Sequence, residues 1–206
     1  AVTTADRMQK VAVQVFDENT VSTPSEIELA ITDVNEWDLS AITTSTELES
    51  YINYLADGDV LYFDSESDIT VNFSSQLNIN FDDLNLDSLT IENRGSGNVV
   101  FDGTSNTRLL YSESSTNSDT LYLKNIVFQN AKVDDHGGAI YSDTVNLNIE
   151  NSTFTNNEVG DSSTLRGGAI YTVNNSTVIV NSSTFEDNIS SNGGGAIFSS
   201  NEAYIY

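Results

Sequence analysis

The stretch Gly137-Gly138-Ala139-Ile140-Tyr141 carries the strongest structural signal in this chain of 206 residues, because it occurs three times. The later copies are Gly167-Gly168-Ala169-Ile170-Tyr171 and Gly194-Gly195-Ala196-Ile197-Phe198. Self-similarity at a period of about 20 to 50 residues is typical of solenoids, in which each unit buries its apolar face by stacking on its neighbours. The sequence therefore predicts a repeat protein.

A second motif alternates with the first. It reads Asn151-Ser152-Thr153-Phe154-Thr155-Asn156-Asn157 and returns as Ser182-Ser183-Thr184-Phe185-Glu186-Asp187-Asn188. A looser copy surrounds Phe128, where the Asn stands two places after the Phe instead of three. Two motifs that alternate in one order at one period are much harder to obtain by chance than a single short match.

Short runs with a period of two lie before each Phe, as in Leu147-Asn148-Ile149-Glu150, and this period indicates β-strands. With one strand before the Asn turn, one around the Phe and one after Gly-Gly, each turn of the solenoid has about three strands. The predicted fold is all-β, a right-handed parallel β-helix of five or six coils over residues 46–206. A short capping helix over Thr46–Ala56 is expected to cover its first coil, since Thr46 offers an N-cap oxygen with Glu49 three places on. Residues 1–45 are assigned to an N-terminal appendage or cap.

Both motifs are interpreted as scaffold. Glycine permits a positive φ and close approach of backbones, and Asn at successive coil corners tolerates the left-handed conformation and can form hydrogen-bonded ladders. The structural repeat residues are Gly137, Gly138, Gly167, Gly168, Gly194, Gly195, Phe154, Phe185, Asn157 and Asn188.

The charge of the chain is extreme, with 31 acidic and 7 basic residues and a net charge of −24. Nucleic acids and anionic membranes need Lys and Arg to neutralise phosphates, so neither is an expected partner. Cysteine is absent, which excludes disulfides and thiolate chemistry. No run of about 18 apolar residues is present, so no membrane insertion is expected of this segment.

The two motifs resemble the repeats of the polymorphic outer membrane protein family and of related adhesin-like surface proteins. The resemblance is carried by Gly137–Ile140, Gly167–Ile170 and Gly194–Ile197, together with Phe154-x-x-Asn157 and Phe185-x-x-Asn188. It covers about 75 residues strongly and implies a right-handed parallel β-helix that is secreted or displayed on a cell surface and that adheres or builds structure. It specifies no ligand.

Asp134-Asp135-His136 is the sharpest enzymatic alternative. Parallel β-helices include pectin-cleaving enzymes, and two carboxylates with the only histidine could act as general acid and base. The three side chains are consecutive at a turn and therefore point in different directions, and no cluster of basic residues accompanies them. We expect no catalytic residue here.

Calcium is a second alternative, because the Asp57/Asp59, Asp64/Asp68 and Asp82/Asp83 pairs offer hard oxygen ligands. No spacing matches a known calcium loop, and Asp is common in exposed turns. No cofactor and no metal site are predicted, with calcium kept as a weak possibility.

Six Asn-x-Ser/Thr triplets are possible glycosylation sites, although a chain rich in Ser, Thr and Asn forms several by composition alone. They begin at Asn72, Asn151, Asn174, Asn175, Asn181 and Asn188. An outward ladder at Tyr122, Asn148 and Ile179 could bind a glycan or a protein, but its residue types are not uniform.

The sequence predicts an extracellular, surface-displayed, adhesin-like or structural fibre module without enzymatic activity. Its expected partner is a glycan or protein on a host or neighbouring cell. A carbohydrate-active β-helix enzyme is one alternative. The chain stops in the alternating run Ala203-Tyr204-Ile205-Tyr206, so the β-helix over residues 46–206 is expected to be a fragment truncated at its C-terminal end. A self-assembling filament subunit is the other alternative, because an open strand edge invites end-to-end association.

Overall fold

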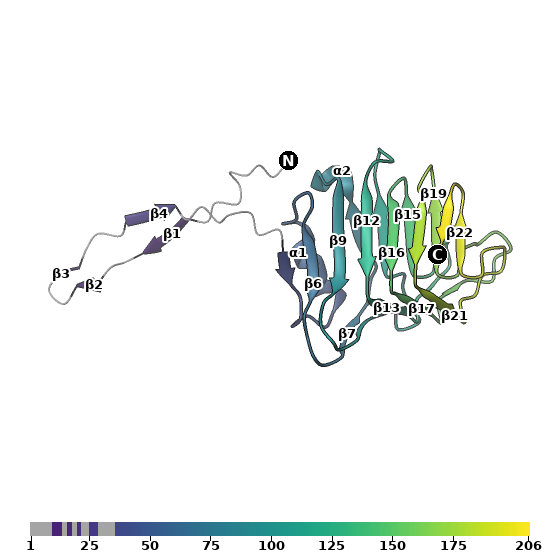
Figure 1. Ribbon diagram of the computed structural model, residues 1–206, viewed down its shortest axis with the longest axis horizontal. Coiled ribbons are helices and arrows are strands. Elements are labelled where there is room, and N and C mark those ends of the chain that lie inside the picture. The colour runs from purple at the N-terminus through teal and green to yellow at the C-terminus, as the bar shows by residue number, and fades with distance from the viewer. Residues whose placement is uncertain (1–9, 14–15, 18–19, 22–24, 29–35) are drawn as a thin grey trace.

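The computed structural model describes residues 10–13, 16–17, 20–21, 25–28 and 36–206. Within residues 36–206 the chain winds as a parallel β-helix with three sheets, and successive coils lie side by side along the long axis of the molecule (Figure 1). This confirms the predicted all-β solenoid with about three strands per coil.

The largest sheet has seven parallel strands in the order β23-β20-β16-β12-β9-β6-β5. Its strands are β5 (Glu36–Asp38), β6 (Val60–Phe63), β9 (Ser88–Asn93), β12 (Thr120–Lys124), β16 (Asn146–Glu150), β20 (Val178–Asn181) and β23 (Ala203–Ile205). Strand β5 pairs with β6 and lies inside the range 1–45 that the sequence assigned to an appendage. The sheet of the β-helix therefore reaches back to Glu36.

Two five-stranded parallel sheets complete each coil. The phenylalanine sheet contains β7 (Ile69–Asn72), β10 (Val99–Asp102), β13 (Ile126–Gln129), β17 (Thr153–Thr155) and β21 (Thr184–Glu186). The tyrosine sheet contains β8 (Leu77–Asn80), β11 (Leu110–Glu113), β15 (Ile140–Asp143), β19 (Ile170–Val173) and β22 (Ile197–Ser199). The short strands β14 (Lys132–Val133) and β18 (Glu158–Val159) pair between the two.

Helix α1 spans Ser45–Ile52, so it starts and ends earlier than the predicted Thr46–Ala56. Its N-cap is Thr44 and not Thr46. The Thr44 hydroxyl accepts the Glu47 N–H at 3.3 Å, and the Glu47 carboxylate accepts the Thr44 N–H at 3.1 Å. This reciprocal capping box satisfies two backbone donors at once, which is why the helix begins there. Leu48 and Ile52 of α1 are buried in the core.

The remaining elements are short. Helix α2 spans Phe81–Leu84 and follows β8 directly. Near the N-terminus, β1 (Lys10–Val13) pairs antiparallel with β4 (Ser25–Glu28), and β2 (Phe16–Asp17) pairs antiparallel with β3 (Thr20–Val21).

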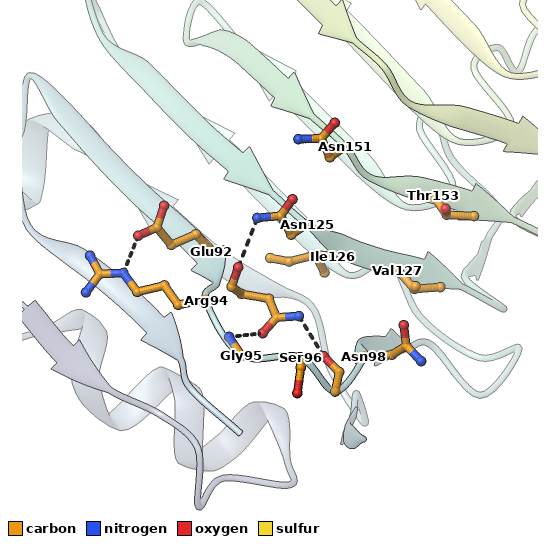
Figure 2. Close-up of a pocket in the computed structure, with 12 residues that line it drawn as sticks. Glu92, Arg94, Gly95, Ser96, Asn98, Asn125, Ile126, Val127, Asn151 and Thr153 are labelled. Atoms are coloured by element: carbon orange, nitrogen blue, oxygen red, sulfur yellow. Dashed lines mark hydrogen bonds and ion pairs between the residues drawn. The ribbon is translucent and has the colours of Figure 1, made fainter. Parts of the chain in front are cut away.

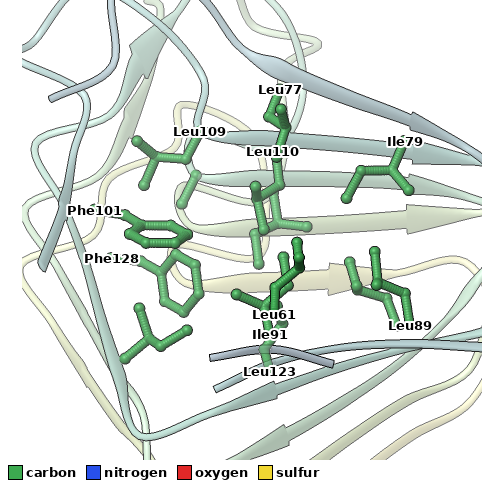
Figure 3. Packing of buried hydrophobic residues seen from close by; sticks show 14 of the residues in the cluster. Leu61, Leu77, Ile79, Leu89, Ile91, Phe101, Leu109, Leu110, Leu123 and Phe128 are labelled. Atoms are coloured by element: carbon green, nitrogen blue, oxygen red, sulfur yellow. The ribbon is translucent and has the colours of Figure 1, made fainter. Parts of the chain in front are cut away.

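The core is one continuous stack of apolar side chains inside the coils (Figure 3). Phe101, Phe128, Phe154 and Phe185 follow one another in register along the phenylalanine sheet. The rings of Phe128 and Phe154 lie 4.7 Å apart, and those of Phe154 and Phe185 lie 4.8 Å apart. Since burial of apolar surface is the main favourable term in folding, this stack explains why a small repeat unit is stable only beside its neighbours.

Candidate functional site

The three Gly-Gly pentapeptides lie directly above one another at one corner of the β-helix. Ile140 is in register with Ile170, and Ile170 with Ile197. Gly137 has φ +68° and donates its N–H to the Arg166 carbonyl at 3.1 Å. A Cβ on Gly138 would lie 2.1 Å from the Gly168 carbonyl oxygen, so only glycine lets the two coils approach this closely.

Asn157 and Asn188 form an amide ladder at another corner. The Asn157 Nδ2 donates to the Phe128 carbonyl at 3.0 Å and to the Asn188 Oδ1 at 2.9 Å, and its Oδ1 accepts the Ala131 N–H at 3.1 Å. Asn157 is fully buried. The positive φ of this turn falls on the preceding residue, 57° at Asn156. These contacts are those of a scaffold.

The outer face of the tyrosine sheet carries a continuous line of rings, which we call the aromatic row: Tyr111, Tyr141, Tyr171 and Phe198. Strand pairing places the four residues in register. Successive ring centres are 5.1, 5.2 and 5.3 Å apart. The rings are half-buried, so the row is a rigid and partly exposed aromatic surface.

Arg108 supports the first half of the row. Its side chain is only 5% exposed, and its guanidinium carbon lies 5.2 Å from the ring centre of Tyr141. The guanidinium donates to the Gly137 carbonyl at 2.9 Å, to Gln76 Oε1 at 2.8 Å and to the Asp135 carboxylate at 3.0 Å. A buried arginine is tolerated because its donors are satisfied and its charge is paired.

Equivalent planar side chains cover the second half. His136 and Arg166 each stand directly before a Gly-Gly pair. The His136 imidazole stacks on Tyr171 at 4.3 Å between ring centres, and the Arg166 guanidinium lies 4.6 Å from the ring centre of Phe198. Each coil therefore sends one planar, nitrogen-bearing side chain over the ring of the coil that follows.

Carboxylates border the row on the other side. Glu113 accepts the Tyr111 hydroxyl at 3.2 Å, and Asp143 is in register with Glu113 on the next coil. Burial, with a contribution from Glu113, raises the pKa of Tyr111. Burial raises the pKa of Tyr141 to about 12, with a contribution from Asp143. Burial is therefore the main cause of both shifts, and the carboxylates add to it.

Asp134, Asp135 and His136 do not form a convergent acid–base group. His136 Nδ1 accepts the Arg166 N–H at 3.0 Å, and Asp135 accepts the His136 N–H at 2.8 Å. Burial works to raise the pKa of the Asp135 carboxyl, but the His136 N–H and the Arg108 guanidinium outweigh it and hold that pKa below its ordinary value. Asp134 lines a hollow of about 410 Å³ together with Lys132 and Arg108.

Three of the six aspartates considered for calcium tie one coil to the next. Asp57 Oδ1 accepts the Ser88 N–H at 2.8 Å, Asp68 Oδ1 accepts the Asn98 N–H at 2.7 Å, and Asp82 accepts the Ser115 N–H at 2.8 Å. Within the part of the chain that the structure describes, no group of three or more His, Cys, Asp or Glu side chains is placed to hold a metal ion.

The six sequons differ in accessibility. Asn72, Asn151, Asn174 and Asn175 are exposed, whereas Asn181 and Asn188 are half-buried. Asn188 also donates its amide N–H to the Phe154 carbonyl at 2.9 Å, so its side chain belongs to the amide ladder. Tyr122, Asn148 and Ile179 are in register on the seven-stranded sheet, as the sequence indicated.

A polar depression of about 620 Å³, the corner groove, lies where the seven-stranded sheet turns into the phenylalanine sheet (Figure 2). It is lined by Glu92, Asn93, Arg94, Gly95, Ser96, Gly97, Asn98, Asn125, Ile126, Val127, Asn151 and Thr153. Sequence reasoning missed both this groove and the aromatic row. The fifth residue of the pentapeptides, Tyr141, Tyr171 or Phe198, was the signal available for the row.

Among the helices that the structure describes, none combines the length and apolar content that a bilayer crossing requires. No curated protein and no solved structure gives a significant match to the chain. Residues 151–173 and 182–200 match the Chlamydia polymorphic membrane protein repeat. These segments contain the Phe-centred strands β17 and β21 and the Gly-Gly turns into β19 and β22. Two segments of this parallel β-helix are therefore similar to the polymorphic membrane protein repeat.

Proposed function

We propose that this chain is a surface-displayed, adhesin-like module without enzymatic activity, and that the aromatic row is its contact surface. The observation that carries the proposal is the registered line of Tyr111, Tyr141, Tyr171 and Phe198 on the outside of the β-helix. Tyr and Arg are enriched where proteins contact partners, since they offer large rigid surfaces at low entropic cost.

The row is also preorganised. Its rings contact one another, and Arg108, His136 and Arg166 pack over the rings of Tyr141, Tyr171 and Phe198. Side chains that are already ordered lose little conformational entropy on binding, so more of the contact energy appears as affinity. The partner that suits this surface is a glycan or a protein on another cell.

Two further observations support the proposal. The matched repeat belongs to proteins named for their place in a membrane, which favours display at a cell surface. Asp135 accepts a hydrogen bond from Arg108, and His136 Nδ1 accepts the backbone N–H of Arg166, so these contacts support the scaffold of the row. An acid–base mechanism needs a carboxylate or imidazole that is within reach of a substrate proton.

Adhesion of coated beads tests the proposal. Beads carrying the full chain should bind to cultured animal epithelial cells or to bacterial cells, and a Tyr111→Ser, Tyr141→Ser, Tyr171→Ser triple variant should bind about tenfold less. The single variant Tyr171→Ser serves if the triple variant melts early. Tyr122→Ser, at an outward position of the seven-stranded sheet, should bind like the unaltered chain.

Two outcomes would overturn the proposal. In one, beads with the unaltered chain adhere to both kinds of cell no better than beads coated with an unrelated acidic protein. In the other, the aromatic-row variants adhere fully while circular dichroism shows them folded.

A further inference from the structure

The corner groove exists because one coil has a longer corner than the two coils that follow. Residues 94–98 connect β9 to β10, whereas Asn125 alone connects β12 to β13. Asn151 and Ser152 connect β16 to β17. The longer connection forms a wall beside Asn125 and Asn151, which occupy the same corner on successive coils (Figure 2).

The wall is held rigidly. Asn93 is buried, its Oδ1 accepts the Gly95 N–H at 3.0 Å, and its Nδ2 donates to the Gly97 carbonyl at 2.8 Å. Gly97 N–H donates to the Ser65 carbonyl at 2.9 Å. A Cβ on Gly95 would lie 2.2 Å from the Ser65 carbonyl oxygen, so the wall is pressed against the preceding coil. The groove is therefore formed before any ligand arrives.

The lining is polar but balanced in charge. The exposed amides are those of Asn98, Asn125 and Asn151. Asn98 Nδ2 donates to the Asp68 carboxylate at 3.1 Å and Asn125 Nδ2 donates to the Asn93 carbonyl at 2.9 Å, so these two residues offer a ligand mainly their Oδ1 acceptors. Asn151 offers both the donors and the acceptor of its amide. Arg94 forms an ion pair with Glu92 at the edge of the groove. In a chain of net charge −24, such a neutral and amide-rich depression selects neither anions nor cations.

The volume of the groove and its other lining residues further restrict the class of ligand that fits. The volume of about 620 Å³ lies within the range of about 300 to 1,000 Å³ that is usual for small-molecule sites. Val127 adds a half-buried apolar strip, and Thr153 adds a hydroxyl. A sugar ring carries hydroxyl groups on its rim and C–H groups on its faces, and it meets both kinds of surface at once.

We propose that the corner groove binds a neutral saccharide, with its hexose hydroxyl groups paired to the amides of Asn125 and Asn151. The inference rests on the proposed adhesive function for its setting, since a surface-displayed module meets the neutral glycans of other cells. The groove is a second contact area, distinct from the aromatic row, which lies on another sheet.

Titration calorimetry with defined oligosaccharides tests the groove. The full chain is produced in a bacterial host without N-glycosylation, because a glycan on Asn151 would fill the groove. Maltotetraose and cellotetraose are the neutral probes, and tetragalacturonate is the acidic probe. At least one neutral probe should bind, and the acidic probe should bind at least about tenfold more weakly, a difference of about 1.4 kcal/mol.

The key variant is Asn151→Gly, which removes the amide and suits the positive φ of 48° at this position. It should weaken binding of the neutral probe about tenfold, and Thr153→Val should weaken it about threefold. Asn175→Gly is the matched control, because Asn175 is also exposed at a positive φ of 70° but lies outside the groove. The control should bind like the unaltered chain.

The saccharide inference fails if neither neutral probe binds, if tetragalacturonate binds as well as they do, or if Asn175→Gly loses as much affinity as Asn151→Gly. The bead assay separates this failure from failure of the adhesive function. Adhesion that depends on the aromatic row and persists in Asn151→Gly would leave the proposed function intact while the saccharide site is rejected.

Discussion

Many side chains in this molecule have the equivalent residues of the neighbouring coils as their packing partners. Phe154 lies between Phe128 and Phe185, and the planes of its ring and the Phe185 ring differ by only 3°. Tyr141 lies in the same way between Tyr111 and Tyr171 on the outside. Each of these side chains is therefore packed against side chains of its own kind. For Tyr141 this packing contributes to burial, which raises the pKa of its hydroxyl group.

Tyr141 should make folding weaken in alkali. Its pKa rises from 10.0 to about 12 in the folded chain, so the folded state holds a proton that the unfolded state releases. The stability this gives is fully present below pH 10 and is lost as the pH rises to about 12. Tyr141→Phe should reduce that alkaline loss by about 1 kcal/mol, since solvent screens part of the effect.

Urea unfolding measured at a series of pH values checks this expectation. Tyr122→Phe, on the seven-stranded sheet, is the control. Equal alkaline profiles for the Tyr141 variant and the unaltered chain would contradict the prediction.

At the scale of the element, each turn is shaped by the coil it touches. The first Gly of each pentapeptide supplies a positive φ, and the second supplies room for the coil above. Gly195 lies on the last coil of this chain, so no coil stacks on it, and the nearest atom to its added Cβ would be the Asn188 carbonyl oxygen at an ordinary 3.6 Å.

In this chain of 206 residues, Gly138→Ala should be strongly destabilising and Gly195→Ala nearly neutral, because a coil stacks on the first position and none on the second. The Cβ at position 138 would meet the Gly168 carbonyl at 2.1 Å, which forces two stacked coils apart. Overpacking of this kind costs about 1 to 3 kcal/mol or more. Thermal unfolding followed by circular dichroism measures both variants. Equal melting temperatures for the two would show that inter-coil approach is not what the second Gly provides.

The sequence predicted correctly the strands whose sequence pattern repeats from coil to coil. The period-two runs and the Gly-Gly and Phe motifs predicted three strands per coil, because an inward position on one coil is an inward position on the next. Strand β5 was missed because three residues, Glu36–Asp38, are too short for a period to show. The N-cap was misplaced because Thr44 and Thr46 both have Glu three places on, and only the fold chooses between them.

The candidate sites were harder to predict for a different reason. Arg108 reaches the ring of the following coil, so its role appears only when the register between coils is known. The corner groove depends on one connection overhanging two shorter ones, which is a relation among three coils. Neither relation leaves a local pattern in the sequence.

At the scale of the whole molecule, charge is the dominant feature. The chain has a net charge of −24, and most of the cations within residues 36–206 are engaged, as Lys132 is with Glu158 and Arg108 with Asp135. Such self-repulsion keeps a protein soluble but opposes the compact state.

Salt should therefore stabilise the fold. Raising the sodium chloride concentration from about 0.01 M to about 1 M shortens the Debye length from about 30 Å to about 3 Å, and the melting temperature should rise by several degrees. A comparison of calcium chloride with sodium chloride at equal low ionic strength separates screening from binding. Equal melting temperatures in the two salts indicate screening alone, whereas a higher melting temperature in calcium chloride would support the calcium site considered from the sequence. A melting temperature that falls with salt would contradict the prediction.

The strand register has one more consequence. Ile140, Ile170 and Ile197 pair in register on three successive coils. Duplicating one of these coils would continue the same pairing, and each added coil would lengthen the β-helix by about 4.8 Å. Gain and loss of whole coils would thus change the length of such a protein in fixed increments.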